Sequence, residues 1–313
     1  MPIGEENQEE CGLENIMDIN KFICFYIHKD EGIIINLNDN NEIKYFDYII
    51  KYMKYIIQIC DKNKEYRDYI YVFELYNTLF DKYRNNNKMK ILLEEILNII
   101  LSKYENCKKD NKLSNYLCLL LTTSFIYYPI ECLQFFLNKN RLREILLFWF
   151  MEIDNIRSHK QMKYNLFGIC ALISLDKNYQ NKLIIDNLKL FIDKILKLTE
   201  ILSKKLVKEN KNKEEKNNKI EEDDDEDYDE DELYKKFLEQ KEINDDEDDE
   251  DWEEEEDEEE DINFTEADKV NPILYVKNIF DLIKQKYPEM FKNILDILGA
   301  NINKLNDIFN KFK

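Results

Sequence analysis

Glycine, proline and histidine are scarce in this sequence of 313 residues, which has five Gly, four Pro and two His. Strand-rich folds need Gly, Asn-Gly or Pro at many tight turns, so this scarcity favours helices. Few glycines also leave little material for a phosphate-binding loop, and no P-loop, G-x-G-x-x-G, G-x-S-x-G or kinase signature occurs. The sequence therefore predicts an all-α fold.

The two histidines, His28 and His159, lie far apart in the sequence and show no metal-ligand spacing. A catalytic pair between one of them and a cysteine is the alternative for an enzyme, but no motif supports it. We therefore predict that the protein is not an enzyme and uses no metal or cofactor.

The seven cysteines contain no C-x-x-C pair, and several lie in apolar runs, as expected of buried, reduced thiols. They are Cys11, Cys24, Cys60, Cys107, Cys118, Cys132 and Cys170. Reduced thiols predict a reducing compartment. The first residues are acidic and polar, unlike a signal peptide. The apolar runs 117–121 and 145–151 are shorter than the ~20 residues of a membrane span. We predict a soluble protein of the cytoplasm and nucleus, without membrane insertion.

Apolar residues recur at helical spacing along most of the chain. In the segment 43–60 they fall at Phe46, Ile49, Ile50, Met53, Ile57 and Cys60. Further helices are predicted over 65–83, 88–104, 114–128, 130–137, 141–153, 160–175 and 184–206. Helix starts near 43, 65, 88 and 114 indicate helical pairs repeating about every 45 residues, a period typical of HEAT and armadillo arrays. A compact helical bundle fits the same pattern equally well.

Near the C-terminus, Asn271 and Pro272 are typical of an N-cap and a first helical position. A second helix is predicted from Pro288, ending at Gly299 in the left-handed αL conformation, and a last helix over 302–312. The predicted organisation is a flexible N-terminus (1–12), a HEAT-like array (13–206), an acidic disordered loop (207–265) with a transient helix near 230–241, and C-terminal helices that complete the array (266–313).

Acidity is concentrated in one internal stretch, 221–261, where more than two thirds of the residues are Asp or Glu. The stretch carries a net charge of about −26, because its only basic residues are Lys235, Lys236 and Lys241. The whole chain carries −21. Like charge at this density opposes folding and nucleic-acid binding and attracts basic partners. The alternative is a charge run that only keeps the protein soluble. The stretch could also bind Ca²⁺ weakly, but it lacks the D-x-D-x-D-G pattern of a calcium-binding loop. Trp252, alone among acids, is typical of an aromatic anchor for a partner.

The predicted partner-binding residues form two acidic clusters around the short helix. They are Glu221, Glu222, Asp223, Asp224, Asp225, Glu226 and Asp227, followed by Asp245, Asp246, Glu247, Asp248, Asp249, Glu250, Asp251, Trp252, Glu253, Glu254, Glu255, Glu256 and Asp257.

Several motifs resemble, in order, those of the importin-7 and importin-8 type of nuclear transport receptor, in the importin-β (karyopherin) superfamily. The residues 245–257 (DDEDDEDWEEEED) are similar to the acidic loop near that family's C-terminus. The preceding DEDELYKKFLEQ (229–240) resembles its short helix. The helix with HKQM (159–162) and GICAL (168–172), the turn at Tyr127-Tyr128-Pro129, and the Asn271-Pro272 helix pair also have counterparts.

This resemblance implies a HEAT-repeat receptor that imports basic cargo, such as ribosomal proteins and histones, into the nucleus. It implies Ran-GTP, nucleoporin FG repeats and importin-β as further partners, and shuttling between cytoplasm and nucleus. The chain would correspond to the C-terminal third of such a receptor, whereas Ran-GTP binds mainly to N-terminal repeats. The alternative is an acidic histone-chaperone-like or scaffold protein that does not depend on Ran.

Overall fold

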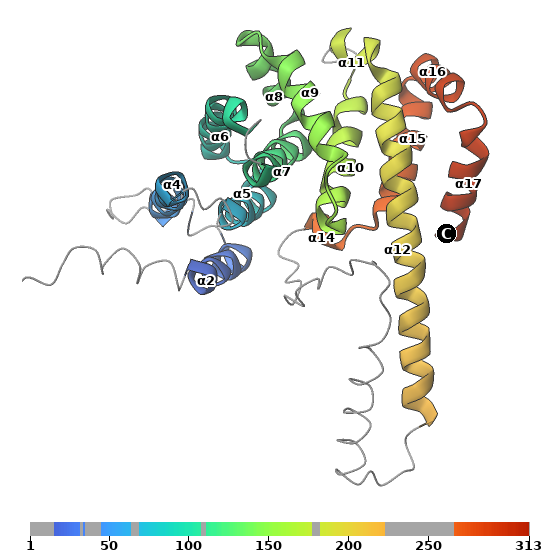
Figure 1. The fold of residues 1–313 in the computed structure, drawn as a ribbon, viewed down its shortest axis with the longest axis horizontal. Coiled ribbons are helices and arrows are strands. Elements are labelled where there is room, and N and C mark those ends of the chain that lie inside the picture. The colour runs from blue at the N-terminus through green and yellow to red at the C-terminus, as the bar shows by residue number, and fades with distance from the viewer. Residues whose placement is uncertain are drawn as a thin grey trace, which may run out of the picture. The chain divides into compact units, whose positions relative to one another are not determined.

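The described part of the chain is helical and contains no strand, which confirms the all-α prediction (Figure 1). The computed structural model describes residues 16–31, 34, 45–63, 69–107, 111–176, 182–222 and 266–312. The helices are α2 (Ile16–Lys29), α4 (Tyr45–Asn63), α5 (Tyr69–Tyr83), α6 (Asn87–Cys107), α7 (Asn111–Tyr127), α8 (Pro129–Asn138), α9 (Leu142–Ile153), α10 (His159–Ile173), α11 (Lys182–Asp186), α12 (Leu188–Glu222), α14 (Glu266–Lys269), α15 (Pro272–Lys286), α16 (Pro288–Leu298) and α17 (Asn301–Lys311).

The chain divides into two compact units, which we describe separately. The first comprises Met1–Ser203 and Asn263–Lys313, and the second comprises Lys204–Ile262. All helix packing discussed below lies within the first unit. The described portion of the second unit is the continuation of α12 as far as Glu222.

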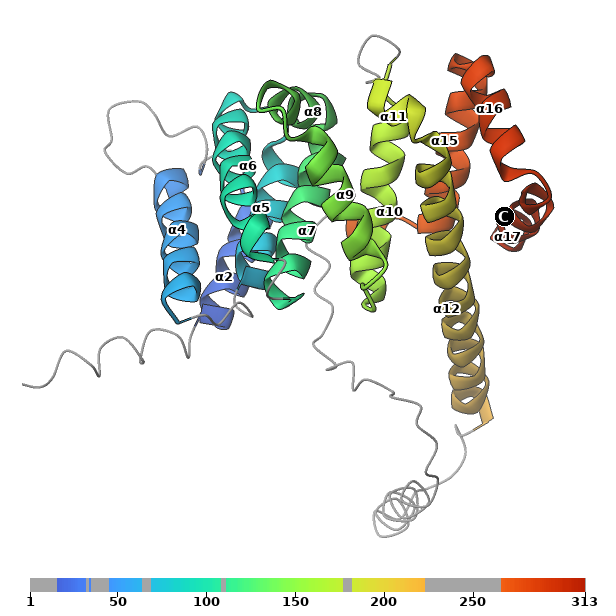
Figure 2. The same ribbon diagram turned by 45° about the horizontal axis from the view of Figure 1, so that its top comes forward.

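The first unit is built in two layers of helices. In one layer α2, α5, α7, α10 and α15 pack on one another in succession. In the other, α4 packs on α5, α6 on α7, and α9 on α7, and α4 lies to the left of α5 and α6 to the left of α7 in Figure 1. The view of Figure 2 follows α4, α6 and α9 through this second layer. The helix α12 contacts α9 of this second layer, since the rings of Phe150 on α9 and Phe191 on α12 lie 4.8 Å apart.

Three helices that pack on the first layer begin at a constant interval. They are α4, α6 and α8, which begin at residues 45, 87 and 129. The contacts from α4 to α6 keep the same register. Lys88 lies over the ring of Phe46, Lys54 pairs with Glu95, and Asp61 pairs with Lys103, and the sequence separation is 41 or 42 in each case. From one pair to the next the residue number increases on both helices, so α4 and α6 run parallel.

Helix boundaries near the C-terminus follow their local chemistry. The Asn271 side chain accepts hydrogen bonds from the backbone N–H groups of Ile273 (2.9 Å) and Leu274 (3.2 Å), which confirms the predicted N-cap before Pro272. At the end of α16, Gly299 has φ 50° and ψ −124°. The positive φ that favours glycine is present, but the ψ value makes the αL prediction wrong.

Two predicted segments differ from the structure. The single helix predicted over 184–206 is broken at Asn187, whose carbonyl oxygen accepts hydrogen bonds from the N–H groups of Leu190 and Phe191. The helix α12 that starts there continues to Glu222, so the residues 207–222, assigned above to the acidic loop, are helical. Lysine and glutamate are good helix formers, which explains how a helix continues there without an apolar stripe. The helices α2 and α14 were not predicted individually.

Candidate functional site

The structure describes few of the predicted partner-binding residues. Glu221 and Glu222 form the end of α12, and their side chains are outside what is described. The remaining residues of the two acidic clusters, including Trp252, lie outside the described residues, as do 1–12 and the short helix predicted near 230–241. Their role in binding basic partners stays a prediction.

The described surface offers a recess between α4 and α6, with a volume of about 380 Å³. Its apolar lining comes from Phe46 and Ile50 on α4 and from Ile91 and Leu92 on α6. The sequence pattern placed Phe46 and Ile50 together on the buried stripe of their helix. In the structure only Phe46 is buried, and Ile50 is half-exposed along the recess.

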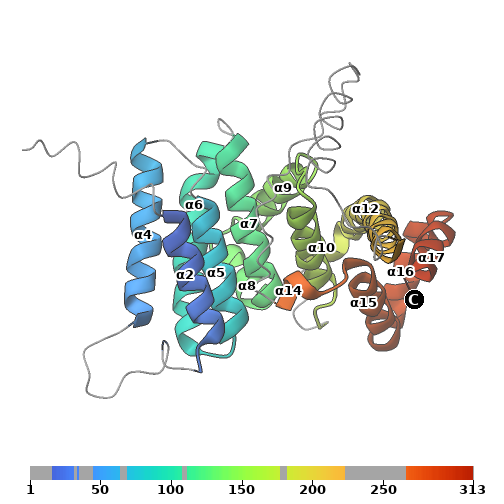
Figure 3. The same ribbon diagram turned by 90° about the horizontal axis from the view of Figure 1, so that it is seen from below.

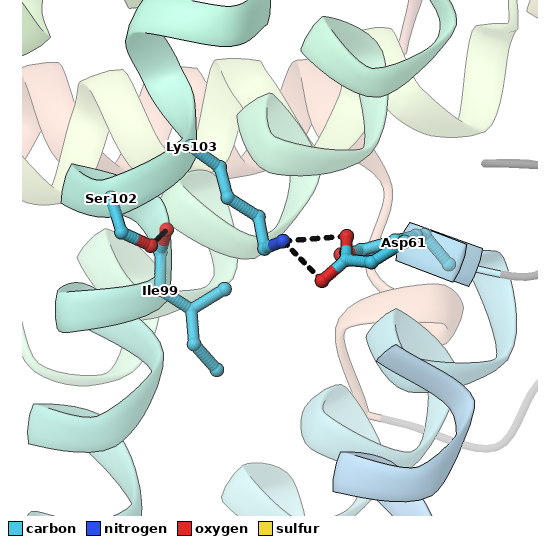
Figure 4. Close-up of polar contacts among 5 residues, drawn as sticks. Asp61, Ile99, Ser102 and Lys103 are labelled. Atoms are coloured by element: carbon cyan, nitrogen blue, oxygen red, sulfur yellow. Dashed lines mark hydrogen bonds and ion pairs between the residues drawn. The ribbon is translucent and has the colours of Figure 1, made fainter. Parts of the chain in front are cut away.

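Ion pairs tie the two sides of this recess together. Lys54 Nζ lies 3.0 Å from Glu95 Oε2 within it. Farther along, Lys103 reaches from α6 to both carboxylate oxygens of Asp61 on α4, at 2.5 Å each (Figure 4). Exposed ion pairs contribute little to stability, on the order of 0.2–1 kcal/mol. Their value here is to hold the register of the two helices.

The recess combines an apolar floor with charged groups of both signs. Lys51, Lys54 and Lys88 line it together with Asp47 and Glu95. A buried apolar or aromatic side chain of a partner would fit such a floor. A second recess of about 290 Å³ lies between α9, α11 and α12, where Leu147, Phe150 and Leu190 line it with Arg143 and Asp186.

A buried polar cluster joins three helices. Asn165 on α10 accepts hydrogen bonds through Oδ1 from Trp149 Nε1 on α9 (2.7 Å) and from Thr122 Oγ1 on α7 (2.8 Å). Cys118 Sγ lies 3.6 Å from the same oxygen, and Asn165 Nδ2 donates to the carbonyl oxygen of Gln161 (2.8 Å). Asn165 and Trp149 are both 0% exposed, so we interpret the cluster as structural.

Neither histidine lies in a group that could bind a metal. His28 is near the end of α2, where its carbonyl oxygen accepts a hydrogen bond from Lys82 Nζ, and His159 is the first residue of α10. No group of three or more His, Cys, Asp or Glu side chains with metal-binding geometry occurs in the described ranges.

Five cysteines in the described ranges are free and buried, which confirms that prediction for Cys24, Cys60, Cys118, Cys132 and Cys170. Burial raises the pKa of the Cys24 thiol to about 12, although the hydrogen bond with the Thr78 side chain lowers it in part. Burial likewise raises the pKa of Cys118, Cys132 and Cys170. These thiols are protonated at neutral pH and are poor nucleophiles.

The raised thiol pKa values predict a loss of stability at alkaline pH. Between the unfolded pKa near 9 and the folded value of about 12, the unfolded chain releases the Cys24 proton and the folded chain keeps it. Unfolding therefore becomes easier as pH rises, by about 1.4 kcal/mol per pH unit for such a group. Urea denaturation from pH 8.5 to 10.5 should show a smaller slope for Cys24→Ala than for the unchanged chain. If the free energy of unfolding falls equally with pH in both proteins, the raised pKa of Cys24 is contradicted.

Membrane-spanning potential in the described ranges is limited to one bent pair of helices. No single helix there is long and apolar enough to cross a membrane, and Leu113–Tyr127 with Pro129–Asn138 reaches the threshold only jointly, across a bend of 118°.

Comparison with protein-family models, curated proteins and solved structures found no significant match for this chain.

Proposed function

We propose that the chain is a helical-repeat receptor of the HEAT type that binds basic proteins through the acid-rich stretch 221–261. The observation that supports the repeat architecture is the register between α4 and α6. In a repeat array each unit contacts its neighbours, and equivalent helices lie parallel, one repeat apart in sequence. Contacts at sequence separations of 41 or 42 have this property, and the period lies within the range of HEAT and armadillo repeats.

The same register extends to the next helices of the layer. Lys90 on α6 pairs with Glu131 on α8 at 3.6 Å, with the same separation in sequence as Lys54 and Glu95. Asp154, the residue after α9, pairs with Lys194 (2.5 Å) and Lys197 (2.9 Å) on α12, at the nearby sequence separations of 40 and 43. Burial alone would raise the pKa of Asp154, but hydrogen bonds from Lys194 and Lys197 outweigh it and lower that pKa. A compact bundle has no reason to repeat one sequence separation, so the array is favoured.

The charge of the acid-rich stretch indicates the class of partner. A net charge of about −26 in this one stretch attracts strongly basic proteins and repels nucleic acid. The helix α12 leads directly into it, so the acids are tethered to a folded unit. If the protein is an importin-type receptor, its partners are ribosomal proteins and histones carried into the nucleus, with Ran-GTP and nucleoporins as transport partners. On the alternative reading the protein is a histone-chaperone-like scaffold.

Neutralising the acids should abolish most binding to a basic partner. In the test variant every Asp and Glu within 223–261 becomes Asn or Gln, which keeps the length and removes the charge. We expect affinity for a histone-tail peptide, measured by fluorescence anisotropy at 50 mM salt, to fall by at least about tenfold. The unchanged chain should lose affinity steeply between 50 and 200 mM salt, whereas the variant should not.

A matched control separates charge from the aromatic anchor. Trp252→Ala removes the aromatic anchor and should therefore weaken binding. It keeps every acid, so the salt dependence of binding should stay unchanged. If the neutralised variant binds as tightly as the unchanged chain, the acid-rich stretch is not the binding site. Release of the basic partner by Ran-GTP, tested on the protein purified from its own cells, would favour the transport receptor. Retention would favour the chaperone-like alternative.

A further inference from the structure

The helix α2 carries an exposed apolar face within the described part of the chain. It packs on α5 through the opposite face, where Asn20, Cys24 and Ile27 are buried. On the outer face Phe22, Phe25 and Tyr26 are 61%, 52% and 53% exposed. A helix that is apolar on both faces is typical of one covered on both sides. Among the described helices, α2 is the first of its layer, and it lies between α4 and α5 in the view of Figure 3.

The exposed face contains a seam that is symmetric about its centre. Asp18, Phe22, Phe25 and Lys29 follow one another at spacings of four, three and four residues, which places them in one line along the helix. All four are exposed. The apolar pair forms the middle of the seam, and an acid and a base occupy its two ends.

We propose that the partner of this face is the α2 helix of a second copy, in an antiparallel, two-fold symmetric pair. A two-fold axis between Phe22 and Phe25 places Phe22 of each copy against Phe25 of the other. The same axis brings Asp18 opposite Lys29 at both ends, which pairs opposite charges. A parallel pair would instead set Asp18 against Asp18 and Lys29 against Lys29, so the charges select the antiparallel arrangement.

The side chains around the seam are consistent with this pairing. The rings of Phe22 and Tyr26 lie 4.4 Å apart, and those of Phe25 and Tyr26 lie 5.9 Å apart, so the three aromatic groups form one continuous surface. Lys29 Nζ lies 5.9 Å from the centre of the Phe25 ring, at the position where it would face the acid of the second copy. Aromatic side chains of this kind supply most of the binding energy in helix–helix interfaces.

The dimer is expected to be weak and reversible, because one helix pair buries less surface than a standard interface. The net charge of −21 on each chain also opposes association. Sedimentation velocity of the full chain at about 0.15 M salt, where that repulsion is screened beyond ~8 Å, should show a monomer–dimer equilibrium in the micromolar range. This inference does not depend on the proposed function.

Substitutions on the exposed seam test the pairing without disturbing the fold. Phe22→Glu should raise the dimer dissociation constant at least tenfold, because it places a carboxylate in the apolar centre. Asp18→Lys and Lys29→Asp should each weaken the dimer by setting like charges opposite each other. The double variant, Asp18→Lys with Lys29→Asp, should restore it, as should an equal mixture of the two single variants.

Two variants on α15 control for net charge. Asp281→Lys and Lys286→Asp make the same charge changes at exposed positions outside the seam and should leave the dissociation constant unchanged. Thermal unfolding of each variant verifies that it is folded. A chain that is monomeric at all concentrations, forms larger oligomers, or dimerises regardless of Phe22→Glu would overturn the proposal. Failure of the double variant to restore the dimer would overturn the antiparallel pairing.

Discussion

Replacing Asn165 by leucine is expected to lower the free energy of unfolding by about 2–3 kcal/mol. Leucine has the same side-chain branching and number of heavy atoms, so the main loss comes from hydrogen bonds, and its bulkier methyl groups add a packing cost. Thr122 Oγ1 loses its acceptor in a fully buried site, Trp149 Nε1 keeps only Thr122 Oγ1 at 2.9 Å, and the carbonyl oxygen of Gln161 loses a donor. Urea denaturation followed by circular dichroism measures the change.

Asn98 is a matched control for this substitution. Its Nδ2 donates to the carbonyl oxygen of Glu94 at 2.9 Å, one turn back, which is the bond that Asn165 makes with Gln161. Asn98 is exposed, so water replaces the lost bond in Asn98→Leu, and stability should change by less than about 0.5 kcal/mol. Equal effects at the two positions would show that the α7–α9–α10 cluster contributes nothing beyond local helix preference.

A double-mutant cycle measures how strongly the cluster is coupled. Trp149→Phe removes the indole N–H that Asn165 accepts, and on its own it should cost about 1–3 kcal/mol. Combined with Asn165→Leu, the total should fall short of the sum, because both changes remove the same hydrogen bond. Additive costs would mean that the two side chains do not interact in solution.

Helix positions were largely predictable from the sequence, because most helices bury one apolar stripe. The helix α4 is an example, since Met53, Ile57 and Cys60 recur at helical spacing and are all buried. The helix α2 was not predicted individually, although its exposed face carries Asp18 and Lys29 beside Phe22 and Phe25. Helical spacing alone does not tell which apolar residues of such a helix are buried.

The Asn165 cluster could not be predicted, because its members are distant in sequence. Trp149 and Thr122 lie 16 and 43 residues from Asn165, and one asparagine in an apolar helix does not indicate its partners. The register of α4 and α6 likewise depends on contacts between helices, which periodicity alone does not supply. The sequence predicted a period of about 45 residues, and the helices α4, α6 and α8 begin at residues 45, 87 and 129. The acid-rich stretch remains a prediction from charge.

Gly168→Val is expected to lower the free energy of unfolding markedly, because the position is tightly packed. A Cβ atom on Gly168 would lie 3.2 Å from Thr122 Cγ2 and 3.2 Å from Trp149 Cζ2, with the carbonyl oxygen of Thr122 at 3.4 Å. Alanine gains about 1 kcal/mol of helix preference, which offsets much of this close contact. Valine adds two methyl groups to the same space and should cost about 3 kcal/mol.

Gly299 supplies the control, because its surroundings are open. No atom lies within 4 Å of a Cβ built there, so the cost of substitution comes from the positive φ of 50°. Gly299→Ala should cost about 1 kcal/mol or slightly more through backbone strain. Valine is β-branched and is itself strained at positive φ, so the comparison uses methionine, which is not β-branched. The step from alanine to methionine should be small at 299 and large at 168. Similar alanine-to-methionine steps at both positions would contradict the close approach of α7, α9 and α10.

The cost at Gly168 should also depend on Asn165. The two side chains that a valine would contact, Thr122 and Trp149, are the ones that Asn165 holds by hydrogen bonds. In an Asn165→Leu background they are free to shift by the few tenths of an ångström that a new side chain requires. We therefore expect Gly168→Val to cost at least about 1 kcal/mol less in that background, a coupling within the range for residues in contact. An unchanged cost would mean that packing alone positions Trp149, and that the hydrogen bonds of Asn165 do not hold it against α10.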